Sequence, residues 1–244
     1  MNMELKEYLD YLVDWLRQEV KKASQKGLVV GISGGIDSAV VAALAKKAFP
    51  KDYITVWMPC KSSELDEKCK MELINDLDLK NVTVDLSQTF EVISKSLNDS
   101  GIEQSKLALA NTKARLRMST LYSMAQTHNY LVLGTDNADE WHIGYFTKFG
   151  DGGVDLLPIV HLLKREVRQA AKILGVPESI INRAPTASLW EDQTDESEIG
   201  FSYDLIDDYI SGKEVPDEVK QRVDHLHKIS EHKRNGAPMP KNIR

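Results

Sequence analysis

The chain has 244 residues, of which 42% are hydrophobic and 28% are charged, and its formal net charge is -6. That length supports one α/β domain with a substantial core, so we expect residues 1–244 to form a single domain. The acidic balance excludes a nucleic-acid-binding protein that works through a general basic surface. Cys60 and Cys69 have no metal or disulfide spacing, and no apolar run approaches a membrane span, which predicts a cytoplasmic protein without a membrane partner.

Two periodicities of apolar residues alternate along the chain. Leu9, Leu12 and Leu16 recur at helical spacing and predict an amphipathic helix over 4–23. Short β-branched runs predict buried strands at 28–32, 53–58, 81–85 and 130–135. Longer periodic runs predict helices at 39–45, from 62 or 63 to 77, 87–97 and 103–128. Strands alternating with helices predict an α/β fold, a doubly wound, Rossmann-like parallel sheet with helices on both faces.

The first predicted strand ends in the turn Ser33-Gly34-Gly35-Ile36-Asp37-Ser38, and a helix follows. A glycine turn before a helix N-terminus directs backbone N–H groups at one point, where an anion such as phosphate is favoured. The Lys and Ser or Thr of the Walker pattern are not in this turn. It carries Asp37 instead, which indicates a divalent cation between this carboxylate and the phosphates. The alternative is that Ser33 or Asp37 merely caps the helix.

A second set of polar residues follows the strand predicted at 130–135. Ligands of doubly wound sheets bind beyond the carboxyl ends of the strands, so residues 33–38 and 135–140 should share one crevice. Glu140 is then a second candidate cation ligand, unless it only begins a solvated helix. Lys164 opens another predicted helix, where a cation opposes the helix dipole and so indicates an anionic neighbour. The alternative is a surface lysine paired with Glu166 or with the partners of Arg168.

The glycine turn resembles the SGGxDS loop of the ATP pyrophosphatases that adenylate their substrates. Six further segments follow in chain order: Asn111–Met118, Gly134–Glu140, Phe146–Gly153, Lys164–Val167, Ala184–Leu189 and Glu231–Arg234. Together with the turn they resemble the ammonia-dependent NAD+ synthetases, whose fold is adenine nucleotide alpha hydrolase-like, over residues 28–234. Each segment is a weak signal, but six in this order are specific.

The resemblance implies an enzyme that catalyses the final step of NAD+ biosynthesis with ATP, Mg²⁺, deamido-NAD+ and ammonia. It implies ATP contacts by Gly31, Ile32, Ser33, Gly34, Gly35, Ile36, Asp37, Ser38, Thr135, Lys164 and Thr186. It implies deamido-NAD+ contacts by Arg115, Tyr122, Tyr145, Lys148, Asp155, His232 and Lys233, with Tyr122 and Tyr145 as ring-stacking partners. Asp37 and Glu140 bind Mg²⁺ by the same resemblance, and Lys164 and Asp37 act in catalysis.

The resemblance also implies a homodimer with the dinucleotide site at its interface. The long helix predicted at 103–128 fits this, because Leu109 and Leu116 lie off its main apolar stripe, although core packing explains them equally well. The polar segment 188–197 is either a lid over the site or a mobile surface loop. Many family members have a different set of polar residues at positions 57–62. This departure affects the expected contacts to the adenine ring, which the backbone could make instead.

Two other readings compete with a synthetase of NAD+. A GMP synthetase-like subunit has the same loop, but it would need a site for a xanthosine phosphate and usually has a dimerisation domain downstream. A non-catalytic ATP-binding module of the same fold would have no use for Lys148, Lys164 or the loop Gly150–Gly153. The chain has no suitable cysteine setting for a glutaminase, so we expect ammonia to be used directly.

Overall fold

A parallel sheet of four strands lies at the centre of the computed structural model, which describes residues 3–60, 64–183 and 195–243. The strands are β1 Gly27–Ile32, β2 Tyr53–Trp57, β3 Asn81–Thr83 and β4 Tyr130–Leu133, in the order β3-β2-β1-β4. Val30 of β1 lies opposite Thr55 of β2, and Leu28 lies opposite Leu131 of β4. The predicted α/β class is confirmed, and the reversal in strand order puts the switch point between β1 and β4.

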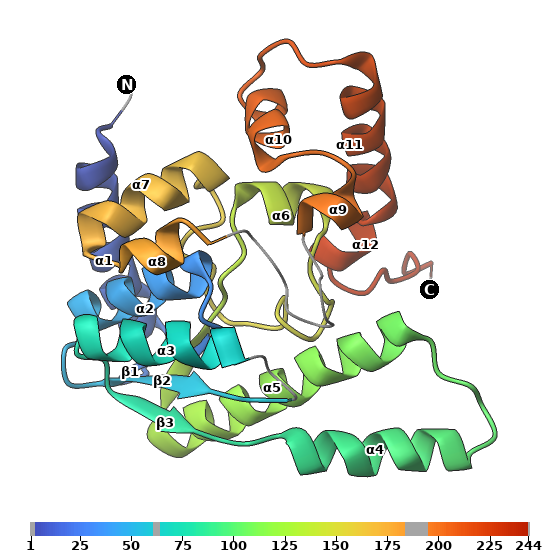
Figure 1. The fold of residues 1–244 in the computed structure, drawn as a ribbon, viewed down its shortest axis with the longest axis horizontal. Helices are drawn as coiled ribbons and strands as arrows, with labels where there is room; N and C mark the ends of the chain where they lie inside the picture. Colours follow the sequence, from blue (N-terminus) through green and yellow to red (C-terminus); the bar gives the residue numbers. More distant parts are fainter. Residues whose placement is uncertain (1–2, 61–63, 184–194, 244) are drawn as a thin grey trace.

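Helices cover both faces of this sheet (Figure 1). On one face lie α1 Leu5–Lys22, α2 Ile36–Ala48, α3 Glu64–Asp76, α7 Lys164–Leu174 and α8 Glu178–Ile181. On the other face lie α4 Ser87–Asp99 and α5 Lys106–His128. Successive side chains of a strand point to opposite faces, so Val29 packs towards α5 while Val30 packs towards α2. This two-sided burial explains why β1 is a continuous apolar run.

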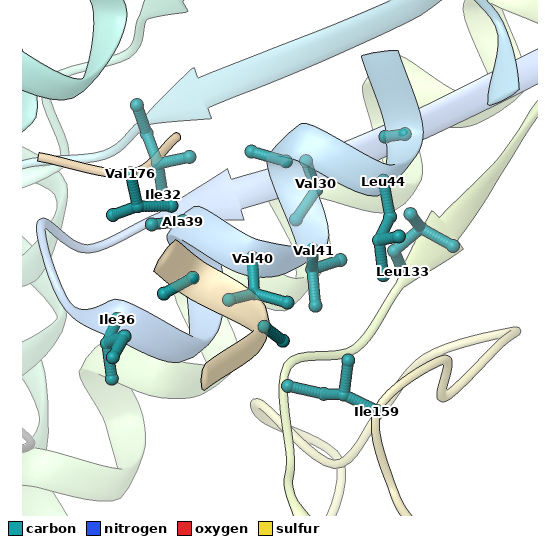
Figure 2. Close-up of a cluster of buried hydrophobic side chains, with 14 of the residues drawn as sticks. Val30, Ile32, Ile36, Ala39, Val40, Val41, Leu44, Leu133, Ile159 and Val176 are labelled. Carbon is teal, nitrogen blue, oxygen red and sulfur yellow. The ribbon is translucent and has the colours of Figure 1, made fainter. Parts of the chain in front are cut away.

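Helix α2 is enclosed by β1, α1 and α7, and Figure 2 shows its apolar side chains among those of the sheet. Val40, Val41, Ala42 and Leu44 are fully buried there. A helix that is apolar on every side needs such an enclosed position. The helix predicted at 39–45 is therefore correct but longer at both ends.

A third group of helices, not predicted from the sequence, surrounds α6 Ala138–Ile143. These are α9 Asp195–Ile199, α10 Tyr203–Ile210, α11 Asp217–Ile229 and α12 Glu231–Arg234. Ile143, Tyr203 and Ile206 belong to one buried cluster that joins them. The group places α10 beside α7, because the two helices contact each other directly.

The strands predicted at 53–58, 81–85 and 130–135 end one or two residues early. After β4 the chain turns away, and Gly134 N donates to Leu156 O at 2.8 Å. Leu109 and Leu116 pack half-buried against the cluster between α4, α5 and the sheet, which favours the core-packing explanation for both residues. Among the described residues, every helix is too short or too polar to cross a lipid bilayer.

Candidate nucleotide-binding and catalytic site

A cavity of about 420 Å³ opens at the switch point between β1 and β4. The turn after β1 lines it with Ser33, Gly35 and Asp37, and the segment after β4 lines it with Thr135 and Glu140. The two segments are about a hundred residues apart in the chain. The structure therefore brings together the two strand ends that the parallel topology was expected to join.

The glycine turn needs its glycine at position 34. Gly34 has a φ of +81°, and a Cβ added there would lie 2.9 Å from the carbonyl oxygen of Asp66. Helix α2 begins after Gly35, and in the described chain no side chain caps it. The alternative that Ser33 or Asp37 serves only as an N-cap is therefore wrong. The first N–H groups of α2 stay available to an anion in the cavity.

The two serines of the turn stabilise its shape. Ser38 Oγ donates to Gly35 O at 3.0 Å and accepts from Ser33 N at 3.2 Å. Ser33 Oγ lies 3.1 Å from Ser38 Oγ and accepts from Gly35 N at 3.2 Å. These hydrogen bonds hold the turn in one conformation, so its backbone N–H groups are arranged before any ligand arrives.

Lys164 lies between two carboxylates at the end of the cavity. Its Nζ donates to Asp37 Oδ2 at 2.6 Å and to Glu140 Oε1 at 3.3 Å, and the residue is only 1% exposed. Asn137 Nδ2 donates to the other oxygen of Asp37 at 2.8 Å, which fixes that carboxylate. The anionic neighbours that explain a lysine at the start of α7 are thus Asp37 and Glu140. A surface pair of Lys164 with Glu166 is wrong, because Lys164 is buried and Glu166 accepts from Leu163 N.

The charges at this end of the cavity depend on one another. Burial disfavours the ammonium of Lys164, but the carboxylates of Asp37 and Glu140 outweigh it and raise the pKa of the lysine. Burial also raises the pKa of Glu140 to about 7, against the attraction of Lys164 and with the repulsion of Asp37. The ammonium of Lys164 therefore favours the ionised form of Glu140, whereas burial and the charge of Asp37 oppose it.

The start of α6 is buried, not solvated. Asn137 accepts from the backbone N–H groups of Asp139 and Glu140, both at 3.0 Å, and caps the helix. Asp136 and Asp139 are 4% and 0% exposed. Burial, with the charge of Asp151 next, raises the pKa of Asp136 well above its usual range. The solvated-helix alternative for this acidic segment is wrong.

The residues expected to contact the dinucleotide fall into two groups. Tyr145 and Lys233 line the cavity, and Lys233 Nζ donates to Gly144 O and Phe146 O. The others lie outside the lining formed by the described residues and are linked in two short chains. Arg115 Nη2 donates to Lys148 O at 3.3 Å, Lys148 Nζ donates to His232 O, and Tyr122 OH donates to Asp155 Oδ1 at 3.0 Å.

Two parts of the expected site fall outside the described residues: Thr186, and residues 188–194 of the segment expected to be a lid or a mobile loop. Trp57 and Met58, in the segment that departs from the family pattern, both line the cavity.

Arg183 and Asp66 belong to the site but were missed from the sequence. Arg183 Nη2 donates to Asp66 Oδ1 at 2.5 Å and Nη1 donates to Gly34 O at 3.4 Å, next to the glycine turn. Both side chains line the cavity. No sequence periodicity relates two residues this far apart. The only sequence signal for Asp66 is its position near the start of the helix predicted from residue 62 or 63.

The switch point, the glycine turn and the two carboxylates around one cation define an α/β protein of the adenine nucleotide alpha hydrolase-like class. The sequence matches the NAD synthase family over residues 8–237, and the chain belongs to this family. The resemblance found in the sequence is thereby confirmed.

Relatives with known names and structures agree with this membership. The NH(3)-dependent NAD(+) synthetase of Mesoplasma florum is 69% identical over 242 residues, with 99% of each chain covered. The solved NMN synthetase from Francisella tularensis is 40% identical with a TM-score of 0.94, covering 99% of this chain and 100% of that one. The NH3-dependent NAD synthetase from Campylobacter jejuni is 27% identical with a TM-score of 0.78, covering 100% of both chains.

Proposed function

We propose that this protein is an ammonia-dependent NAD+ synthetase in which residues 1–244 act as one catalytic domain. One observation carries the proposal: a buried ammonium, that of Lys164, lies between Asp37 and Glu140 beside a glycine turn at the switch point. Such an arrangement suits the transfer of a nucleotidyl group, where charge develops on phosphate oxygens. We further propose a cytoplasmic reaction, because buried thiols such as those of Cys60 and Cys69 stay reduced in that compartment.

The reaction has two steps. The nicotinate carboxylate of deamido-NAD+ attacks the α-phosphorus of ATP, which forms an acyl adenylate and releases pyrophosphate. Ammonia then attacks the acyl carbon, AMP leaves, and a proton is lost to give the amide. The N–H groups of the glycine turn bind the phosphates that depart as pyrophosphate, and Lys164 stabilises the charge that develops at the transferring phosphorus.

Asp37 and Glu140 are the residues that would hold Mg²⁺ during this reaction. The donor set fits the ion, because Mg²⁺ takes one or two carboxylates and completes its shell with phosphate oxygens and water. The two carboxylates already share one cation, the ammonium of Lys164. Mg²⁺ held by these carboxylates would neutralise negative charge on the phosphates.

We also propose a homodimer through the α4–α5 side of the molecule. This side carries large exposed apolar residues, namely Val92, Ile102, Leu107 and Phe149. Arg115 and Tyr122 also lie on α5, so a dimer formed there would put the expected dinucleotide contacts at the interface.

The protein is expected to sediment with a mass twice the 27.5 kDa of one chain. Replacing Val92 and Phe149 together by serine should shift it towards the monomer, since an apolar interface loses buried area. Ile173→Ser on α7 removes another exposed apolar side chain, away from the proposed interface, and should leave the dimer intact. A wild-type monomer, or equal behaviour of both variants, contradicts this interface.

The function is tested by measuring AMP and pyrophosphate release with ATP, Mg²⁺, ammonium and deamido-NAD+. We expect NAD+ to form in equal amount to AMP, and glutamine to replace ammonium poorly because a glutaminase nucleophile is not expected in this chain. Turnover only with xanthosine monophosphate would favour a GMP synthetase-like enzyme. No turnover with either acid would favour the non-catalytic module.

One comparison favours a second candidate, a synthetase of the mononucleotide NMN. The Francisella tularensis NMN synthetase has a TM-score of 0.94, against 0.78 for the Campylobacter jejuni NAD synthetase. The same carboxylate would then be activated on a substrate that lacks the adenylate half. Running the assay with nicotinate mononucleotide beside deamido-NAD+ decides between the two by the ratio of kcat/KM. We expect deamido-NAD+ to be preferred, in line with the Mesoplasma florum relative at 69% identity.

A further inference from the structure

Helix α10 contacts Lys164 through two residues that the sequence did not connect with the site. Tyr203 and Asp207 are four positions apart and therefore share one face of the helix. Both are 0% exposed. Buried polar groups need hydrogen-bond partners. The partners of Tyr203 and Asp207 include Lys164 itself and residues that lie next to it in the site.

Tyr203 contacts the charged end of the lysine. Lys164 Nζ lies 4.7 Å from the centroid of the tyrosine ring, which allows a cation–π interaction. The hydroxyl of Tyr203 donates towards Glu140 Oε1, 3.2 Å away, and Asp195 Oδ2, 3.1 Å away. Lys164 Nζ donates to the same Oε1, so the tyrosine restricts the carboxylate that the ammonium contacts.

Burial raises the pKa of Tyr203 well above its usual range, and the charges of Glu140 and Asp195 add to this, which favours the protonated hydroxyl as the donor.

Asp207 contacts the backbone end of the lysine. Its carboxylate accepts from Lys164 N at 2.9 Å, Arg165 N at 3.1 Å and Arg165 Nε at 2.7 Å. The residue before α7 is Leu163, whose side chain cannot cap a helix. Asp207, from another helix, supplies this cap together with Asp139 of α6, whose Oδ2 also accepts from Lys164 N at 2.9 Å, and the charge of Asp207 favours the positive end of the α7 dipole.

We propose that Tyr203 and Asp207 are positioning residues for Lys164, one fixing its ammonium and the other its backbone. The inference rests on the proposed synthetase function, in which Lys164 contacts the reacting phosphate. A lysine side chain has four rotatable bonds, so its direction must be set by contacts. With Lys164 set in place before ATP binds, the charge is present where the transition state needs it.

The test compares two variants with two matched controls on the same helix. Tyr203→Phe keeps the ring and removes the hydroxyl, and Asp207→Asn keeps the shape and removes the charge. The controls are Tyr209→Phe, whose hydroxyl donates to Asp224, and Asp208→Asn, whose carboxylate pairs with Arg165 and Lys213. Each hydrogen bond to a charged group is worth enough that both test variants should lower kcat about tenfold or more, with the KM for ATP within about twofold. The controls should keep wild-type kcat.

A double-mutant cycle shows whether the effect passes through Lys164. In a Lys164→Met background, Tyr203→Phe should cause no further fall in single-turnover rate, because residues that act together are not additive. Wild-type kcat in Tyr203→Phe, or a full additional fall in the Lys164→Met background, overturns the inference while the synthetase function stands. A wild-type protein without turnover on either nicotinate substrate overturns the function and the inference together. Should Asp207→Asn not fold, Tyr203→Phe alone decides.

Discussion

Replacing Lys164 by methionine is expected to lower kcat by about a hundredfold or more while the protein stays folded. The ammonium is buried and contacts both Asp37 and Glu140. Methionine has nearly the same length and fills the same space, but it carries no charge to the phosphorus. Glu140, whose pKa is already raised to about 7, can take up a proton and so relieve the repulsion between the two carboxylates. The measurement is steady-state AMP release with saturating ATP, together with a thermal unfolding curve.

Lys172→Met is the matched control for this variant. Lys172 is in the last turn of the same helix, α7, and its side chain is exposed. Loss of a single exposed charge there should leave kcat unchanged within about twofold. Near-normal turnover in Lys164→Met would remove this lysine from the mechanism, and an equal fall in both variants would point to damage to α7 as a whole.

Replacing Gly34 by alanine is expected to weaken ATP binding by about tenfold or more, because the turn can no longer direct its N–H groups at one point. Gly34 has a φ of +81°, and the new Cβ would lie 2.9 Å from Asp66 O. An alanine at such a φ costs about 1–2 kcal/mol. The approach to Asp66 adds a displacement of the turn itself. Isothermal titration of ATP with Mg²⁺ measures the affinity directly.

Gly212→Ala separates the effect of the positive φ from the effect of the close approach to Asp66. Gly212 has a φ of +75°, close to that of Gly34, but an added Cβ meets no atom of the described residues within 4 Å. Both variants should therefore lose similar backbone stability, and only Gly34→Ala should lose ATP affinity. Unchanged ATP affinity in Gly34→Ala would show that phosphates do not bind at this turn.

The sequence alone predicted those features of the site that a single helix, strand or turn determines. The strand–glycine turn–helix around Ser33–Ser38 was recognised from local chemistry, and the position of Lys164 followed from the conflict between its charge and the helix dipole. The meeting of Asp37 and Glu140 followed from topology, because parallel strands present their carboxyl ends at one edge. These are properties of single elements or of a repeated βα pattern.

Contacts between distant elements could not be predicted in this way. Arg183 meets Asp66 across 117 residues, and Asp207 meets Lys164 across 43 residues, with no periodicity that relates either pair. The serine hydroxyls of the glycine turn bond to the turn's own backbone and to each other, a choice that depends on the exact turn conformation. The C-terminal helices were missed because their burial depends on packing around α6 and not on the sheet.

The reliance of Lys164 on α10 has a consequence for synthesis of the protein on the ribosome. The sheet is complete once residue 133 has been made, and α7 once residue 174 has been made. The partners of Lys164 on α10 are translated only afterwards, at Tyr203 and Asp207. A nascent chain can thus assemble its central layer early, but the contacts of Lys164 with α10 form only when the last quarter of the chain emerges.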